Sequence, residues 1–241
     1  MPELRVKLIA LVAIAVAAAT STTEAPVPEV SAELMGLRAR AELGETDAQV
    51  SLGFRYRRGE GFLPNDTAAA RWFRAAADQG DATAQFNLGF HYREGRGVPQ
   101  DDANAIRWYR RAAEQGDADA QNNLAGMYAR GNGVRPNGPE AMRWWTLAAD
   151  QGHPVAQSNL GFMYGEGLGL PGRGAATVRR YGAQDYVRAH MWLSLAASYA
   201  TGAVRDGALQ GLARAAQRMS AAQLAEARRL AREWRLARQV R

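Results

Sequence analysis

Residues that could act as metal ligands or catalytic groups are few in this sequence and lie far apart. None of the three histidines, His91, His153 and His190, has a second histidine at the helical spacing that zinc sites use. The chain has no cysteine, so it offers no thiol nucleophile, and it has no Gly-x-Ser-x-Gly nucleophile elbow. We therefore expect no catalytic residue, no metal site and no cofactor, and we interpret the histidines as surface or packing residues.

Two further patterns could be mistaken for chemical motifs. Asp101 and Asp102 are adjacent carboxylates, but Asp101 stands where a helix should begin, which explains it as an N-cap. Gly167, Gly169 and Gly172 match the glycine spacing of a dinucleotide-binding loop, yet they follow a predicted helix rather than a strand. Neither pattern supports an enzyme.

The residues that do form a pattern recur every 36 positions along the chain. A fixed period of this length is typical of a solenoid, in which each unit buries its apolar face only by stacking on its neighbours. The registered positions are leucine at 52, 88, 124 and 160, tyrosine at 56, 92, 128 and 164, and glycine at 59, 95, 131 and 167.

The first half of each period predicts an amphipathic helix, which we call helix A. In the second period Ala84, Leu88 and Tyr92 lie four residues apart with polar residues between them. This helix should end at Gly95, because glycine adopts the left-handed conformation of a helix C-terminus without strain. Gly97 shortly afterwards disfavours a restart of the helix.

The second half of each period predicts another helix, helix B, which carries a tryptophan on its apolar face. In the second period Ala105, Trp108 and Ala112 share that face, and Gly116 ends the helix. Seven residues before each tryptophan stands a residue that commonly caps helices. These predicted N-caps are Asn65, Asp101, Asn137 and Asp185.

The whole unit, A-Q-x-N-L-G-x-x-Y-x-x-G-x-G-V-P-x-D-x-x-x-A-x-x-W-x-x-x-A-A-x-Q-G, resembles the Sel-one-like repeat, a relative of the tetratricopeptide repeat. The resemblance implies an all-α fold, a right-handed α-solenoid of two-helix repeats with helical caps at both ends. It also implies an adaptor or regulator of protein assemblies rather than an enzyme. Some secreted members carry a disulfide in each repeat and are linked to β-lactam binding or hydrolysis, but a chain without cysteine does not support such a hydrolase. The four repeats are expected at 47–80, 81–116, 117–152 and 153–202.

The ends of the chain differ from the repeats. Basic residues followed by an apolar run and small residues predict a cleavable signal peptide at 1–19, and hence a periplasmic or secreted protein. A flexible linker at 20–30 and a capping helix at 31–46 should follow. Residues 203–241 should form capping helices, one with Leu209, Leu212 and Ala216 on its packed face, the other at 221–239 begun by a Ser220–Gln223 capping box.

Candidate partner-binding residues come from two places. The first is an insertion at 171–181 in the last repeat, which contains Arg173, Arg179 and Arg180 and could be functional or merely tolerated. The second is helix A, which we expect to line the concave side of the solenoid. There an apolar row directly follows the glycine inside the helix, the one after the registered leucine in the repeat unit. The alternative is that these side chains pack between successive A helices. The row comprises Phe54, Arg55, Phe90, His91, Met127, Phe162 and Met163.

Charge suggests a further class of partner. The formal net charge is +6, and five arginines, at 228, 229, 232, 235 and 238, lie on the polar face of the last predicted helix. They could contact an anionic membrane or polysaccharide, or they could simply be solvated. We expect no nucleic-acid partner.

The favoured function is a non-enzymatic periplasmic scaffold or regulator that binds a protein partner in the cell envelope through its concave face. The alternative is an envelope structural protein.

Overall fold

The computed structural model describes residues 32–167 and 183–239, and all regular elements within these ranges are α-helices. The predicted signal peptide, the linker and the 171–181 insertion lie outside the described residues. The helices are α2 (Ala32–Glu42), α3 (Thr46–Arg58), α4 (Asp66–Asp78), α5 (Ala82–Glu94), α6 (Asp102–Glu114), α7 (Ala118–Arg130), α8 (Gly138–Asp150), α9 (Pro154–Glu166), α10 (Ala183–Tyr199), α11 (Gly202–Ala216) and α12 (Ala221–Gln239).

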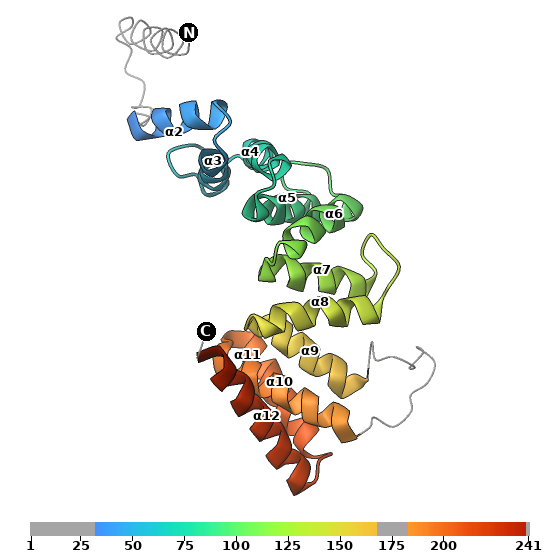
Figure 1. Ribbon diagram of the computed structural model, residues 1–241. Helices are drawn as coiled ribbons and strands as arrows, with labels where there is room; N and C mark the ends of the chain where they lie inside the picture. The colour runs from blue at the N-terminus through green and yellow to red at the C-terminus, as the bar shows by residue number, and fades with distance from the viewer. Residues whose placement is uncertain (1–31, 168–182, 240–241) are drawn as a thin grey trace, which may run out of the picture.

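The helices form an elongated stack in which each packs on the next from α2 to α11, with α2 at one end and α12 at the other (Figure 1). Helices α3, α5, α7 and α9 are the A helices, and α4, α6, α8 and α10 are the B helices. This arrangement confirms the predicted all-α solenoid of two-helix repeats.

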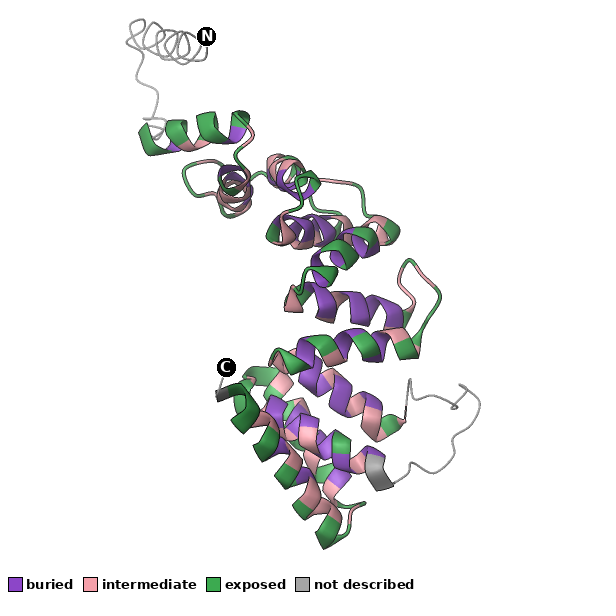
Figure 2. Cartoon of the chain, viewed as in Figure 1, coloured by how far each residue is buried: buried purple, intermediate pink, exposed green. Residues whose placement is uncertain are grey.

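Burial differs between the two kinds of helix. In α7, between two B helices, Asp119 and Arg130 are the exposed residues, whereas α6 and α8 each keep an exposed polar face (Figure 2). Helices α5, α7 and α9 each pack between two B helices, and α3 packs between α2 and α4. The A helices are the more buried layer, because the B helices keep an exposed face.

Most helix starts follow the sequence prediction. Asn65, Asp101 and Asn137 each accept a hydrogen bond from the main-chain N–H three residues ahead, as N-caps do. The prediction for Asp185 is wrong, because α10 already begins at Ala183. Asp185 lies instead in the first helical turn, where a carboxylate is favoured by the positive end of the helix dipole.

Helices A and B of one repeat approach closely at a glycine inside helix A. A Cβ atom at Gly53 would lie 2.6 Å from the ring of Phe73, and one at Gly89 would lie 2.8 Å from the ring of Tyr109. The residue that follows the tryptophan in helix B thus packs directly on helix A of the same repeat. The sequence prediction missed this contact, because it assigned only the tryptophan and the alanines of its face to the core.

The turn between the two helices contains a second glycine with a different role. Gly97 has a φ of +70°, and a Cβ atom there would overlap the main-chain carbonyl group of Asp66, at the start of helix B in the preceding repeat. This glycine therefore allows the turn of one repeat to pack directly against the start of helix B in the preceding repeat.

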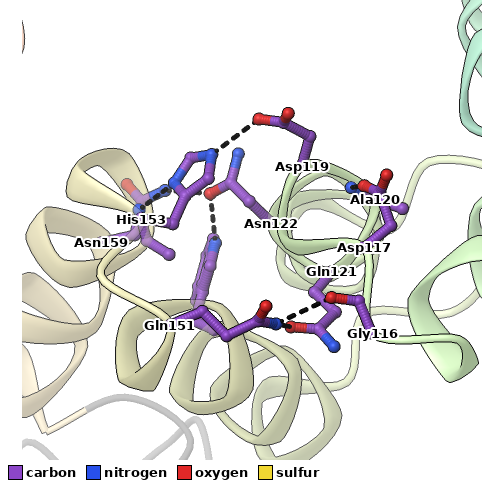
Figure 3. A network of polar contacts seen from close by, with 11 residues as sticks. Gly116, Asp117, Asp119, Ala120, Gln121, Asn122, Gln151, His153 and Asn159 are labelled. Atoms are coloured by element: carbon purple, nitrogen blue, oxygen red, sulfur yellow. Dashed lines mark hydrogen bonds and ion pairs between the residues drawn. The ribbon is translucent and has the colours of Figure 1, made fainter. Parts of the chain in front are cut away.

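Successive repeats are also joined by a recurring pair of glutamines (Figure 3). The side-chain amide of Gln151, at the end of α8, donates to Gln121 Oε1 and to the carbonyl oxygen of Gly116, each at 2.9 Å. Gln121 in turn donates to the Ala113 carbonyl oxygen at 3.0 Å. We call this arrangement the glutamine clasp. Equivalent clasps are formed by Gln115 with Gln85 and by Gln79 with Gln49.

The last repeat has an incomplete clasp. Gln157 donates to the Ala149 carbonyl oxygen, but its Oε1 atom is buried and has no partner among the described residues. The donor position is occupied by Tyr199, which is 54% exposed.

Replacing Tyr199 with glutamine is expected to raise the free energy of unfolding by about 1 kcal/mol, because a new amide can satisfy the buried oxygen. Urea unfolding followed by circular dichroism measures the change. Tyr199→Leu removes the same ring without supplying a donor and serves as the control. Equal stability of the two variants would contradict this explanation.

The C-terminal helices end the stack in an unexpected way. Helix α11 packs on α9 and α10, as a further helix A would, but its buried residues are Ala208, Gly211 and Ala215. The predicted face is partly correct: Leu212 packs against the core, but Leu209 is exposed. Leu193 approaches Gly211 so closely that only small residues fit at the centre of the contact.

Helix α12 begins with the predicted Ser220–Gln223 capping box and then turns back onto the outer face of α10. Leu195 on that face is buried, whereas Arg111 at the equivalent position of α6 is exposed. The outer face of α10 is apolar because α12, through Ala231 and neighbouring residues, covers it.

Candidate partner-binding surface

Three of the residues predicted to face a partner belong to the core. His91 and Met127 are completely buried, and Met163 is 7% exposed. His91 Nδ1 donates to the Arg96 carbonyl oxygen at 2.6 Å, and burial lowers the pKa of the imidazole. The expectation that these three side chains are free to bind a partner is therefore wrong, and substituting His91 or Met127 should destabilise the fold.

The three predicted phenylalanines are only partly buried. Phe54, Phe90 and Phe162 stand at equivalent positions of α3, α5 and α9, and Gly126 takes the same position in α7. Each ring packs on the core with one side, as Phe54 does against Phe73 with ring centroids 5.2 Å apart. The alternative considered from the sequence, packing between helices, is thus correct for part of each ring.

The phenylalanine rings are accompanied by arginine side chains. The guanidinium of Arg57 lies 4.9 Å from the centroid of Phe54, and that of Arg93 lies 5.6 Å from Phe90. Arg214, on α11, lies 5.8 Å from the ring of Phe162. Such cation–π contacts hold the guanidinium beside the ring. We name the three phenylalanines together with Arg57, Arg58, Arg93 and Arg214 the Phe-Arg row.

At Gly126, where the row has no ring, the Arg130 guanidinium fills the space. A Cβ atom at Gly126 would lie 3.1 Å from Arg130 Nη2. Within the described residues Arg130 and Arg214 form no ion pair, whereas Arg93 pairs with Glu94 at 2.6 Å and Arg57 donates to Asn87 at 2.7 Å. The face formed by the A helices therefore carries arginines with unused hydrogen-bond donors.

The remaining predicted residues lie elsewhere. Arg55 forms an ion pair with Glu33 of α2 at 2.8 Å, so it fastens the N-terminal helix to the first repeat. Arg173, Arg179 and Arg180 lie outside the described residues. The structure thus gathers the phenylalanines and not the other members of the predicted row.

A cavity of about 330 Å³ adjoins the end of the Phe-Arg row between α9, α10 and α11. Phe162 and Leu193 form apolar walls, while Glu166, Tyr186 and Arg214 supply polar groups. A hollow with apolar walls and a few polar groups is suited to receive one side chain of a partner.

Sequence reasoning missed the arginines of the row, although part of the signal was present. Arg57 and Arg58 follow Phe54 by three and four residues, and Arg93 follows Phe90 by three, which places them on the same side of the helix. Arg214 reaches Phe162 from another helix, so no local spacing could reveal it.

The described residues contain no group of three metal-ligating side chains. In the same part of the chain, no helix is both long and apolar enough to cross a membrane. Asp101 serves as an N-cap, as predicted.

The repeated helix pairs, the clasps between them and the row along the A helices define a helical-repeat protein. The family model of the Sel1 repeat matches residues 46–81, 82–117, 118–153, 154–172 and 178–198. The chain therefore belongs to the Sel1 repeat family. Members of this family are generally protein–protein interaction scaffolds and are typically not enzymes.

Two solved structures are similar over most of this chain. One is c5321, a protective antigen present in uropathogenic Escherichia coli strains and displaying an SLR fold, with 41% identity and a TM-score of 0.63 over 71% of this chain. The other is a Sel1 repeat protein from Oxalobacter formigenes, with 31% identity and a TM-score of 0.59 over 73% of this chain. The chain spans 34% and 48% of these two structures. No curated protein matches it.

Proposed function

We propose that this protein is a non-enzymatic periplasmic scaffold or regulator that binds a partner protein of the cell envelope through the Phe-Arg row. The observation that carries the proposal is the pairing of arginines with half-buried phenylalanines at equivalent positions of α3, α5 and α9; the arginine comes from the same helix at Phe54 and Phe90 and from α11 at Phe162. Aromatic residues and arginine are the types most enriched at the energetic centres of protein interfaces.

The geometry supports an extended segment as the bound form of the partner. Phe90, Gly126 and Phe162 occupy equivalent positions of α5, α7 and α9, and Arg93, Arg130 and Arg214 of α11 lie beside them. A segment lying across these helices would therefore meet the three arginines in turn. Their guanidinium groups can donate to main-chain carbonyl oxygens or carboxylates, while the rings receive apolar side chains. In the free protein the guanidiniums of Arg93 and Arg214 lie beside the rings of Phe90 and Phe162 and reduce their exposure to water.

A periplasmic location is supported by residues 1–19, where basic residues precede an apolar run of twelve residues and several alanines. This order is that of a secretory signal peptide, and the run is shorter than the roughly 20 residues of a membrane-spanning helix.

The test is photo-crosslinking in intact cells from Thr83, an exposed position of α5, followed by separation of the envelope fraction. Arg93→Gln combined with Arg214→Gln should reduce the yield of the crosslinked partner about tenfold, since loss of two interface arginines costs roughly 1.4 kcal/mol or more. The matched control replaces Arg71 and Arg107, which are exposed on the B helices.

The proposal fails if the control variant loses the crosslink equally, or if the crosslinked species is found only in the cytoplasmic fraction. Melting curves of both variants should match that of the parent, because every substituted side chain reaches solvent.

A further inference from the structure

The arginines of α12 are separated by the structure into two sets. Arg229 lies between two carboxylates, Glu226 at 2.6 Å and Glu233 at 2.5 Å. Arg238 covers the ring of Trp234 at 4.7 Å and donates to the carbonyl oxygen of Gln151. These two have structural partners, and a functional role is not needed to explain them.

The other three arginines, Arg228, Arg232 and Arg235, line one side of a groove between α10 and α12. Its volume is about 590 Å³, and His190 and Ser194 of α10 form the opposite side. Within the described part of the chain none of the three arginines pairs with a carboxylate; Arg235 donates only to the Ala231 carbonyl oxygen at 3.2 Å. Three uncompensated positive charges therefore share one hollow.

His190 adds a polar group at a position that is apolar in other repeats. The equivalent residues of α6 and α8 are Ile106 and Met142, both buried in the core. His190 is 9% exposed, and its Nδ1 atom has no partner among the described residues. Because α12 turns back onto α10 instead of packing on α11, no further helix B covers this side of α10 in the described structure.

We propose that this groove is a second binding site, which accepts an acidic segment of a partner protein independently of the Phe-Arg row. Carboxylates of the segment would pair with Arg228, Arg232 and Arg235, which lie on one side of α12 at spacings of four and three residues. An apolar side chain of the segment would rest on Ala231 and on Leu236, which is 60% exposed.

The shape of the site favours a peptide over a lipid surface. Binding in a membrane interface requires a broad apolar helix face in addition to positive charge. Leu236 is the one large, exposed apolar side chain within the described residues of α12, so a comparable face is missing there. A concave groove with separate charged and apolar places is suited to a chain with side chains of both kinds.

The experiment measures fluorescence anisotropy of a short labelled peptide of glutamate and leucine, titrated with the full mature chain. Replacing Arg228, Arg232 and Arg235 with glutamine should weaken the affinity at least about thirtyfold. The charge-matched control replaces Arg71, Arg107 and Arg143, which are exposed on the B helices, and should change the affinity less than about threefold. Helix content and melting temperature of each variant confirm folding.

Three results would overturn the proposal. The first is equal weakening by both triple variants, which would mean that only net charge matters. The second is binding of phosphatidylglycerol vesicles through the groove without binding of the peptide, which would assign the site to lipid. The third is peptide binding that depends on Arg93 and Arg214, which would place the peptide on the Phe-Arg row. Normal peptide binding by the Arg93 and Arg214 variant supports two separate sites.

Discussion

The Gly97→Ala variant is expected to lose roughly 3 kcal/mol or more of its free energy of unfolding. A left-handed residue with a Cβ atom costs about 1–2 kcal/mol in backbone strain. The new methyl group also overlaps the main chain of Asp66, which cannot move without disturbing the start of α4. Urea unfolding followed by circular dichroism measures the loss.

Gly116→Ala is the matched control, because Gly116 also has a left-handed φ, +94°, but has open space around its Cβ position. This variant should lose only the strain contribution of about 1–2 kcal/mol. Equal losses in the two variants would show that contact between repeats at Gly97 contributes nothing to stability.

The Trp108→Ala variant is expected to lose about 3–5 kcal/mol, the range for truncating a buried aromatic side chain. The indole is 7% exposed and packs with residues of the preceding helix B, including Ala69, Phe73 and Ala76. Arg111 lies 4.7 Å from its ring, so the truncation also removes a cation–π contact. Calorimetry and urea unfolding should both report the change.

Two comparisons make this expectation specific to packing between repeats. Trp108→Phe should lose less than Trp108→Ala, because most of the apolar contact remains. Leu63→Ala, at a residue that is 88% exposed, should unfold like the parent protein. A Trp108→Ala variant with parental stability would remove this ring from the core.

The fold could be predicted from the sequence because its determinants are local and repeated. Glycines at helix ends, N-cap residues such as Asp101, and apolar positions within one helix all act within a few residues. Each local signal occurs several times in register, so an irregular copy could be interpreted through the others.

The candidate site could be predicted only in part, because side chains placed every four residues do not stay on one face of an α-helix. Ala84, Leu88 and Tyr92 follow that spacing, but a helix has 3.6 residues per turn, so its buried stripe continues to residue 91. His91 accordingly packs near Phe73 of the preceding helix B, with ring centroids 5.6 Å apart. The same register places Met127 in the core.

The C-terminal arrangement could not be predicted from local signals. The bounds and the capping box of α12 were correct, but its return onto α10 depends on contacts between distant residues, such as Trp192 with Trp234. The ion pairs of Arg229 with Glu226 and Glu233 lie within α12 and follow from local spacing. The groove that Arg228, Arg232 and Arg235 line depends on the return of α12 onto α10.

The glutamine clasps bear on how such a chain could change its length during evolution. Each complete junction uses the same donors and acceptors, so an internal duplication of 36 residues would create a new boundary already supplied with all its hydrogen-bond partners. A duplication whose length is not a multiple of 36 would leave buried amides unmatched. The repeat carrying Tyr199 lacks one donor, so a copy of it placed inside the array would join less firmly than the others. We therefore expect that longer relatives of this chain gained their additional repeats by duplication of the central units.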